Sequence, residues 1–420
     1  MTAPPRLHPM TGSRAAAVLL ASLAIAWPVR SAAQEPAVGP PLRPLVLESP
    51  AGQRFRVVPI ATGLEHPWSL AFLPGGRTML VTERPGRLRL IRDDGLDPRP
   101  IAGVPDVYAE HIGGLNEVAL HPEFARNGLV YLSYSKAGER GATLALARGR
   151  FDGTQLVDVH DIFVADAWEP AGPTTRGGGG TYGGRMAFGP DGMLYLTVAD
   201  RDTMVLTGNP EVRMRAQNLG DHVGKILRLR DDGSVPDDNP FVGQPGARPE
   251  IYTYGHRNAY GLAFHPDTGA LWELEIGPLA GDEVNILVPG GNYGWPLVSL
   301  GRDYSGQFVS EQPWWRPGIE MPLIFWVPAI SPSGMVFYTG DRFPAWQGSL
   351  FVSALGARQL QRIVFNDGMP IGRPESLLTE IGQRFRDVRQ GPNGYLYVLT
   401  EGRVTGDDAL GAVLRIEPAE

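Results

Sequence analysis

Four short segments of the chain combine residue types that can bind a charged ligand: 254–261, 275–285, 290–296 and 384–388. Each places arginine, asparagine, carboxylate or glycine residues within a few positions of one another. Arginine, as at Arg257, carries a permanent charge on a planar fork that pairs bidentately with carboxylates. The four segments are therefore the candidates for a binding site.

Copies of one repeated unit surround these segments and predict how they are positioned. Each copy has an apolar strand, a turn of Pro, Gly or Asp, and a second strand with β-branched and aromatic residues. Six copies occur, at residues 71–83, 119–134, 187–198, 263–273, 335–352 and 390–399. Antiparallel units that recur about every 50–75 residues are typical of propeller blades.

The repeats predict an all-β fold, a six-bladed β-propeller with four-stranded antiparallel blades. Residues 55–60 precede the first copy, and we expect them to supply the outer strand of the last blade and so close the ring. An array of β-sandwiches would need linkers between the copies, and the sequence shows none. In a propeller, the segments that join the repeats converge over the central channel, where ligands bind.

Three other features are interpreted as structural. His121 and His265 occupy the same turn position of the repeat that Gly189 holds in another copy, so we interpret them as turn residues and not metal ligands. The glycine run at 177–180 is followed by neither Lys-Ser/Thr nor a helix start, as a phosphate-binding loop requires. A loop is the better interpretation.

The N-terminus predicts export. Basic residues precede an apolar run at 15–29, and small residues follow at 31–33, which is the pattern of a secretory signal peptide. The run is shorter than the roughly 20 residues of a membrane-spanning helix; the alternative is an uncleaved anchor. We expect a signal peptide at 1–33, a Pro/Ala-rich linker at 34–50 and a single propeller domain at 51–420, in a periplasmic or secreted protein without membrane insertion after signal cleavage.

Composition excludes several classes of function. Cysteine is absent, which rules out thiolate catalysis, thiolate zinc sites and iron–sulfur clusters, and leaves the core to hold an exported chain together. The net charge of −7 argues against nucleic acid as a partner, because such proteins present a basic face.

The four segments, in their order, resemble the soluble PQQ-dependent glucose/sorbosone dehydrogenases, including the aldose sugar dehydrogenases. The similarity rests on Gly-His-Arg-Asn at 255–258, Gly-Gly-Asn-Tyr-Gly-Trp-Pro at 290–296 and Arg-x-Arg-Asp-Val at 384–388. It covers nearly the whole mature chain. The resemblance implies a sugar oxidised at its anomeric carbon by hydride transfer to PQQ beside a calcium ion, followed by transfer to a soluble electron acceptor.

The resemblance also implies roles for individual residues. Cofactor-binding residues would be Arg257, Asn258, Arg384 and Arg386, whose cations suit the three carboxylates of PQQ. Catalytic calcium would be held by the backbone carbonyls of Gly277 and Pro278, since calcium prefers oxygen donors. A second, structural calcium site would involve Glu283 and Tyr293. The alternatives are a solvated strand edge for Arg384 and Arg386, and a surface carboxylate for Glu283.

Three positions depart from the family pattern. Thr181 stands where the family has its general base, a histidine four residues before an arginine, and a threonine hydroxyl does not titrate near neutral pH. Ile112 replaces a glutamine that contacts quinone and sugar, and Gly356 replaces a lysine that pairs with PQQ. Asp200, which would orient the missing histidine, is retained.

Two hypotheses follow from these departures. In the first, the chain still oxidises aldoses with PQQ and calcium, with His111 or Tyr182 in place of the base, Asp200 retained, and Arg358 in place of the lysine. In the second, the propeller has lost sugar dehydrogenase chemistry and binds or transforms another small ligand. A protein-binding propeller is a weaker third idea, because it has no need of clustered arginines.

Overall fold

The computed structural model describes residues 40–168, 181–202, 210–311, 314–402 and 410–419. From Val38 onward the chain forms one compact unit. The predicted signal peptide at 1–33 and the glycine run at 177–180 lie outside the described residues. None of the described helices is long and apolar enough to cross a membrane.

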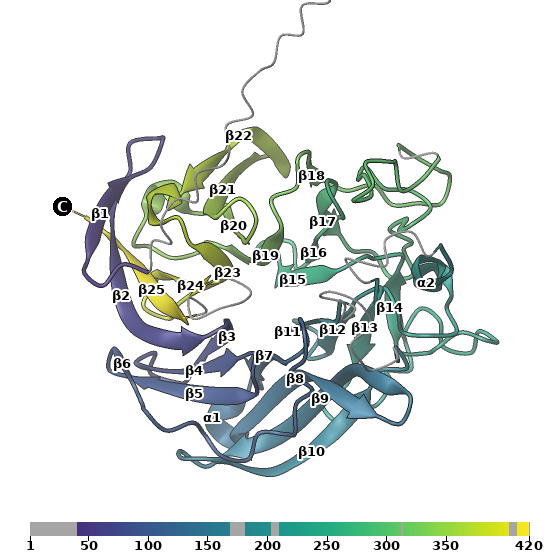
Figure 1. Cartoon of the computed structure of the whole chain (residues 1–420), viewed down its shortest axis with the longest axis horizontal. Helices are drawn as coiled ribbons and strands as arrows, with labels where there is room; N and C mark the ends of the chain where they lie inside the picture. Colours follow the sequence, from purple (N-terminus) through teal and green to yellow (C-terminus); the bar gives the residue numbers. More distant parts are fainter. Residues whose placement is uncertain (1–39, 169–180, 203–209, 312–313, 403–409, 420) are drawn as a thin grey trace, which may run out of the picture. The chain divides into compact units, whose positions relative to one another are not determined.

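The unit consists of six antiparallel sheets arranged in a ring (Figure 1). The six-bladed β-propeller predicted from the repeats is therefore confirmed. The first four blades in chain order consist of β3 (Pro67–Phe72), β4 (Thr78–Glu83), β5 (Arg87–Arg92) and β6 (Gly95–Leu96); β7 (Leu115–Leu120), β8 (Leu129–Gly138), β9 (Gly141–Phe151) and β10 (Leu156–Val164); β11 (Gly183–Phe188), β12 (Leu194–Val198), β13 (Lys225–Leu229) and β14 (Ile251–Tyr254); and β15 (Ala259–Phe264), β16 (Leu271–Glu275), β17 (Asp282–Ile286) and β18 (Ile324–Trp326).

The last two blades follow the same plan. They consist of β19 (Pro332–Phe337), β20 (Leu350–Ala354), β21 (Gln359–Asn366) and β22 (Met369–Leu377); and β23 (Arg384–Gln390), β24 (Leu396–Glu401) and β25 (Leu410–Pro418), to which β2 (Arg54–Glu65) and β1 (Leu45–Glu48) are added. Helical segments are short: α1 (Phe124–Asn127), α2 (Pro210–Met214), η1 (Arg215–Gln217), η2 (Pro344–Trp346) and η3 (Thr379–Ile381).

The two ends of the chain close the ring within one blade. Strand β2 pairs antiparallel with β25, with Phe55 opposite Pro418 and Val57 opposite Ile416. The prediction that residues 55–60 supply an outer strand of the last blade is confirmed. Strand β1 pairs with β2 as a fifth strand, so the segment 34–50 contains regular structure where a linker was expected.

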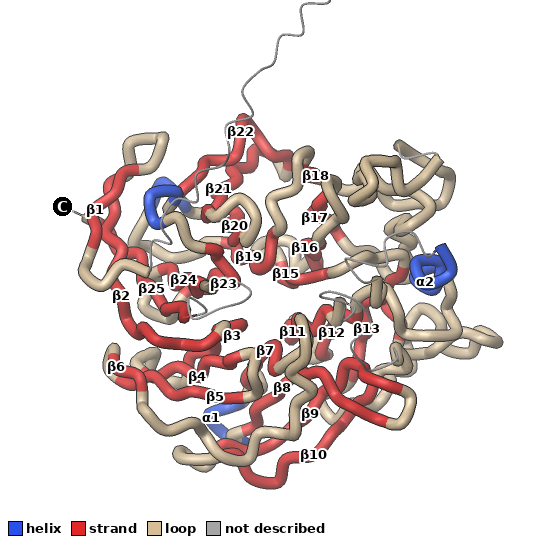
Figure 2. The backbone as a smooth tube through the Cα atoms, in the orientation of Figure 1, coloured by secondary structure: helices blue, strands red, loops and turns tan. Residues whose placement is uncertain are grey.

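The innermost strand of each blade lines the centre of the ring, where β3, β7, β11, β15, β19 and β23 contact one another in sequence (Figure 2). Within a blade the neighbouring strand runs antiparallel, so the beginning of an innermost strand and the end of the next strand lie at the same end of the central channel. We call this end the channel mouth. Candidate residues that lie at these positions include Thr181 before β11, Arg257 before β15 and Gly277 after β16.

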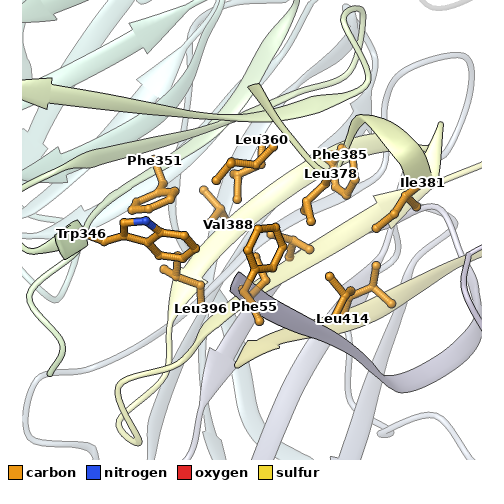
Figure 3. Packing of buried hydrophobic residues seen from close by; sticks show 14 of the residues in the cluster. Phe55, Trp346, Phe351, Leu360, Leu378, Ile381, Phe385, Val388, Leu396 and Leu414 are labelled. Atoms are coloured by element: carbon orange, nitrogen blue, oxygen red, sulfur yellow. The ribbon is translucent and has the colours of Figure 1, made fainter. Parts of the chain in front are cut away.

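Apolar side chains between neighbouring blades form the core. In the cluster between the last two blades, Phe343 stacks on Trp346 with ring centroids 4.1 Å apart, and Phe55 from the closing strand meets Trp346 edge-on (Figure 3). Burial of a large apolar side chain contributes about 1.5–3 kcal/mol. The β-branched and aromatic residues of the repeats are thus the ones that hold the blades together.

A network of buried ion pairs crosses the channel below its mouth. Arg185 on β11 pairs with Glu117 on β7 at 2.8 Å and with Asp387 on β23 at 3.1 Å, and its guanidinium lies over the Trp68 ring. Arg389 contacts the same two carboxylates from β23. The network holds two cations and two anions, so it carries no excess charge.

Candidate active site at the channel mouth

Three arginines converge on one buried carboxylate at the channel mouth. Glu401, at the end of β24, accepts hydrogen bonds from Arg386 Nε and Nη2 at 3.2 and 2.6 Å. Arg84, just after β4, and Arg384, at the start of β23, each place a nitrogen 4.0 Å from a Glu401 oxygen. His66 Nδ1 lies 3.2 Å from Glu401 Oε1. We call these five residues the Glu401 cluster.

The Glu401 cluster carries excess positive charge. Burial opposes ionisation of Glu401, but Arg386, His66, Arg384 and Arg84 hold its pKa well below the usual range. Burial and the neighbouring guanidinium charges lower the pKa of Arg384 and of Arg84, while Glu401 opposes the shift. Arg384 Nε is buried and has no hydrogen-bond partner in the part of the chain that the structure describes. Three guanidinium groups around one carboxylate form a binding site for an anion.

Arg257 and Asn258 reach the mouth from the start of β15. Arg257 Nη1 donates to the carbonyls of Ile276 at 2.7 Å and Gly277 at 2.9 Å, and its guanidinium lies over the Trp295 ring. The Asn258 side chain is buried, and its Oδ1 accepts no hydrogen bond among the described residues. An unpaired buried amide oxygen costs free energy, which a ligand donor would recover.

The turn after β16 presents backbone carbonyls at the same end. Asp282 fixes its shape: Oδ1 accepts from the Gly277 backbone at 2.8 Å, and Oδ2 accepts from Ile330 and Ser331 at 2.6 and 2.8 Å. Burial raises the pKa of Asp282 to about 6 in spite of these three bonds. A Cβ on Gly277 would lie 2.4 Å from the Ala280 carbonyl, so only glycine fits here.

Thr181 and Asp200, which the sequence placed together in the catalytic centre, are joined by a hydrogen bond. The Thr181 hydroxyl donates to Asp200 Oδ1 at 2.9 Å, and the Asp202 backbone donates to the same oxygen. Asp200 Oδ2 is buried without a partner in the described ranges. Burial raises the pKa of Asp200 to about 6, against the attraction of Arg257. The pKa of Asp200 therefore lies close to neutral pH, where its carboxyl group can exchange a proton.

The two candidate replacement bases, Tyr182 and His111, have different surroundings. Tyr182 is buried, and the Arg201 guanidinium covers its ring at 3.8 Å. His111 is half-buried on the loop before β7, with a left-handed backbone (φ 56°). Its neighbour Ile112 packs against the apolar cluster that contains Tyr182, so this loop makes an apolar contact with the cluster.

Gly356 and Arg358 follow β20 at the mouth. A Cβ at Gly356 would lie 2.8 Å from Ser331 Oγ and 2.9 Å from the Ile330 carbonyl, so this backbone conformation leaves no room for a side chain. Arg358 is close enough to Arg384 for its charge to lower the pKa of Arg384. Arg358 therefore adds a positive charge close to Arg384.

Glu283 and Tyr293 do not point into the mouth. Glu283 lies opposite Glu275 on neighbouring strands. The Tyr293 hydroxyl donates to the Ile286 carbonyl and accepts from the Val288 backbone, both at 2.8 Å. Its ring stacks on His256. Both residues lie within the fourth blade and its following loop.

Sequence reasoning missed Arg84, His66 and Glu401. A signal was present, because Glu83-Arg84 and Glu401 lie where the second strands of the first and last blades end, and this end of the strand is at the mouth. The turn assignment of the other histidines is confirmed: His121 Nδ1 accepts from the Glu123 backbone, and His265 Nδ1 from the Asp267 backbone.

Comparison with known proteins gives this geometry a context. The family model described as Glucose / Sorbosone dehydrogenase matches residues 64–410. The chain belongs to the glucose/sorbosone dehydrogenase family. The aldose sugar dehydrogenase YliI of Escherichia coli is 42% identical over 84% of this chain and 91% of its own length.

Solved structures of the family superpose on the same propeller. The apo form of the soluble aldose sugar dehydrogenase from Escherichia coli has a TM-score of 0.78 at 38% identity, and covers 87% of this chain and 100% of its own. The PQQ-bound form of the aldose sugar dehydrogenase from Streptomyces coelicolor has a TM-score of 0.67 at 28% identity, and covers 90% of this chain and 99% of its own. The resemblance to an aldose sugar dehydrogenase-like quinoprotein, stated above from three motifs, is confirmed.

Proposed function

We propose that this chain is a PQQ- and calcium-dependent oxidoreductase that oxidises aldose sugars. The observation that carries the proposal is the Glu401 cluster, in which three arginines face one carboxylate at the channel mouth. Excess fixed cations in a partly buried site favour a ligand with several carboxylates, and PQQ has three. The PQQ-bound relative from Streptomyces coelicolor supports the same cofactor.

The residues at the mouth fit such a ligand. Arg384 and Arg386, joined by Arg84, would pair with carboxylates, and the unpaired Arg384 Nε is a donor available for one of them. Arg257 and Asn258 would hold the opposite side. The Gly277 and Pro278 carbonyls would hold calcium, an ion that prefers oxygen donors. The Gly277 carbonyl already accepts a bond from Arg257, so it is directed at a cationic partner.

Bound PQQ would supply the acceptor for the hydride of the anomeric carbon, and the protein would have to take the proton of the anomeric hydroxyl. We assign this step to Thr181 and Asp200. Thr181 Oγ1 accepts the substrate proton as its own proton passes along the 2.9 Å bond to Asp200 Oδ1. Asp200 is suited to this because burial raises its pKa to about 6. In this relay Asp200 is the final proton acceptor, because the threonine hydroxyl does not itself titrate near neutral pH.

The alternative bases, His111 and Tyr182, make a different prediction. If the relay operates, Asp200→Asn abolishes turnover, while His111→Ala and Tyr182→Phe retain most of it. If either residue is the base, its own replacement removes turnover. Each variant is first checked for PQQ binding by quinone absorbance, which separates loss of cofactor from loss of proton transfer.

The deciding experiment uses the purified protein with PQQ and calcium. Quinone absorbance measures binding, and reduction of an artificial dye with glucose and other aldoses measures turnover. We expect binding at micromolar PQQ and dye reduction with at least one aldose. Absence of PQQ binding contradicts the proposal, and binding without turnover on any aldose contradicts its substrate class.

We further propose export to the periplasm, on the basis of the N-terminal sequence. Mass spectrometry of the protein recovered from the periplasmic fraction should give an N-terminus near Gln34. An N-terminus at Met1, or recovery in the cytoplasmic fraction alone, contradicts this proposal.

A further inference from the structure

A buried group of one histidine and two glutamates lies behind the mouth, in the fourth blade. His256, Glu273 and Glu275 each offer one ligand atom, and these atoms lie within 4.8 Å of one another. The side chains of His256 and Glu273 are fully shielded from solvent, and Glu275 nearly so. Glu273 and Glu275 project from one face of β16, opposite Asn285 and Glu283 on β17. The sheet geometry alone therefore forces several carboxylates together.

The imidazole ring of His256 is fixed through one nitrogen, and its other nitrogen faces the two glutamates. His256 Nε2 lies 2.8 Å from Thr253 Oγ1, which fixes the ring, and the Tyr293 ring stacks on it at 4.8 Å. Nδ1 lies 3.7 Å from Glu275 Oε2 and 3.9 Å from Glu273 Oε2, beyond hydrogen-bond distance. Nδ1 and Glu273 Oε1 are both buried without a partner in the described part of the chain. Separations of this size are those between two ligands of one cation.

Charge balance leads to the same conclusion. Glu273 Oε2 accepts one hydrogen bond, from Asn285 Nδ2 at 3.0 Å, and Glu273 Oε1 has no partner among the described residues. Arg257 donates its backbone N–H to Glu275 Oε2, but it directs its guanidinium to the carbonyls of Ile276 and Gly277. Two buried carboxylates without a nearby guanidinium are costly, and one divalent cation would neutralise them.

A second buried histidine–glutamate pair in the same protein shows the contrast. His222 Nε2 lies 3.4 Å from Glu250 Oε2, and its Nδ1 accepts from the Asp166 backbone at 2.8 Å. Both ring nitrogens of His222 are thus used within the protein. At His256 one nitrogen is left over, and it is the one that faces the carboxylates.

We propose that His256, Glu273 and Glu275 bind a divalent transition-metal cation, separate from any calcium at Gly277 and Pro278. An imidazole nitrogen with two carboxylates suits Mn²⁺, Fe²⁺ or Zn²⁺, whereas calcium takes oxygen ligands. The donors also differ from the pair Glu283 and Tyr293 expected at a second calcium site. Thr253 acts as the outer-shell partner that orients the imidazole. The cation would tie the start of β15 to β16, directly behind Arg257.

The test uses Mn²⁺ alone on the untagged, chelator-treated full chain, without PQQ or sugar. We expect one tightly bound Mn²⁺ per chain by equilibrium dialysis, with nitrogen coupling from one imidazole in pulsed EPR. Carbonyl ligation at Gly277 and Pro278 would give no such coupling. The result therefore does not depend on whether the chain oxidises sugars.

Variants locate the site. His256→Gln should remove the nitrogen coupling, and Glu273→Gln should weaken Mn²⁺ binding at least as much as loss of an outer-shell partner, which costs about 10–100-fold. Thr253→Val should fall in that range, and Glu250→Gln, the matched control, should bind as wild type does. Circular dichroism verifies that each variant folds. The EPR spectrum of the wild-type protein tests the proposal even if a variant fails to fold. Absence of stoichiometric Mn²⁺, absence of nitrogen coupling, or coupling that survives His256→Gln overturns the proposal.

Discussion

Replacement of Glu401 by glutamine tests whether one carboxylate holds the arginines of the mouth together. The side chain is 2% exposed, accepts two bonds from Arg386 and faces Arg84 and Arg384 at 4.0 Å. Removal of its charge leaves three guanidinium groups without their anion. Loss of one partner from a buried ion pair costs about 3–5 kcal/mol, and we expect about 4 kcal/mol here because glutamine keeps an oxygen acceptor.

The assay is urea unfolding followed by tryptophan fluorescence, with Glu65→Gln as control. Glu65 pairs with Arg87 at 2.7 Å close to the same arginines, but its side chain is 45% exposed. Solvent screens such a pair, so we expect a loss of about 0–1 kcal/mol. Sulfate should restore more stability to Glu401→Gln than to the wild type, because an anion can replace the missing charge.

Two results would refute the reasoning about Glu401. A loss below about 1 kcal/mol, equal to that of the control, would mean that water screens the arginines as it does at the surface. Equal stabilisation of both proteins by sulfate would mean that the arginines do not form an anion site. The contribution of Glu401 has a pH signature as well: its pKa is depressed, so its stabilisation is present at neutral pH and is lost only as the pH falls through the depressed pKa.

Three further outcomes are expected. Thr181→Val should lower turnover by about 10²–10⁴-fold with unchanged PQQ absorbance, while Thr181→Ser retains the relay. Equal rates in the two variants would show that the hydroxyl takes no part in proton transfer. Turnover should rise with pH through about 6, because Asp200 accepts a proton only when ionised and burial raises its pKa to about 6; a rate that is flat between pH 5 and 8, measured at saturating dye, contradicts this. Gly277→Ala should lose calcium-dependent PQQ binding, because its Cβ would lie 2.4 Å from the Ala280 carbonyl. An unaltered calcium titration would show that the turn can move. Gly95→Ala, whose Cβ would meet only the Arg92 carbonyl at 3.4 Å, is the control.

The sequence was sufficient for the fold because the repeats carry both the period and the chemistry of blades. Alternating β-branched and aromatic residues separated by Pro/Gly/Asp turns specify antiparallel strands locally, and identical units can pack on one another only in a ring or array. Closure by residues near Phe55 was also predictable, since an incomplete last blade needs a strand from the other end. Strand β1 was not, because the Pro/Ala-rich composition around it masked the strand.

The candidate site was predictable where residues follow one another in the chain, and was not where strands bring them together. Residue type and spacing were enough to predict two pairs, Arg257 with Asn258 and Arg384 with Arg386. Glu401 with Arg84 and His66 joins segments more than 300 positions apart, and only the closure of the ring places them in contact. The sequence gives the charge of each side chain, but the residue with which that side chain pairs depends on which strands become neighbours.

The sequence by itself determined an all-β propeller with six blades, the arginine-rich segments at one end of its channel, and a threonine in place of the base. Tertiary structure decided which groups share a site and in which electrostatic state. Burial sets the pKa of Asp200, leaves His256 Nδ1 unpaired and surrounds Glu401 with arginines. These properties depend on removal of water and on distances across blades, and neither quantity is encoded in any one segment of the chain.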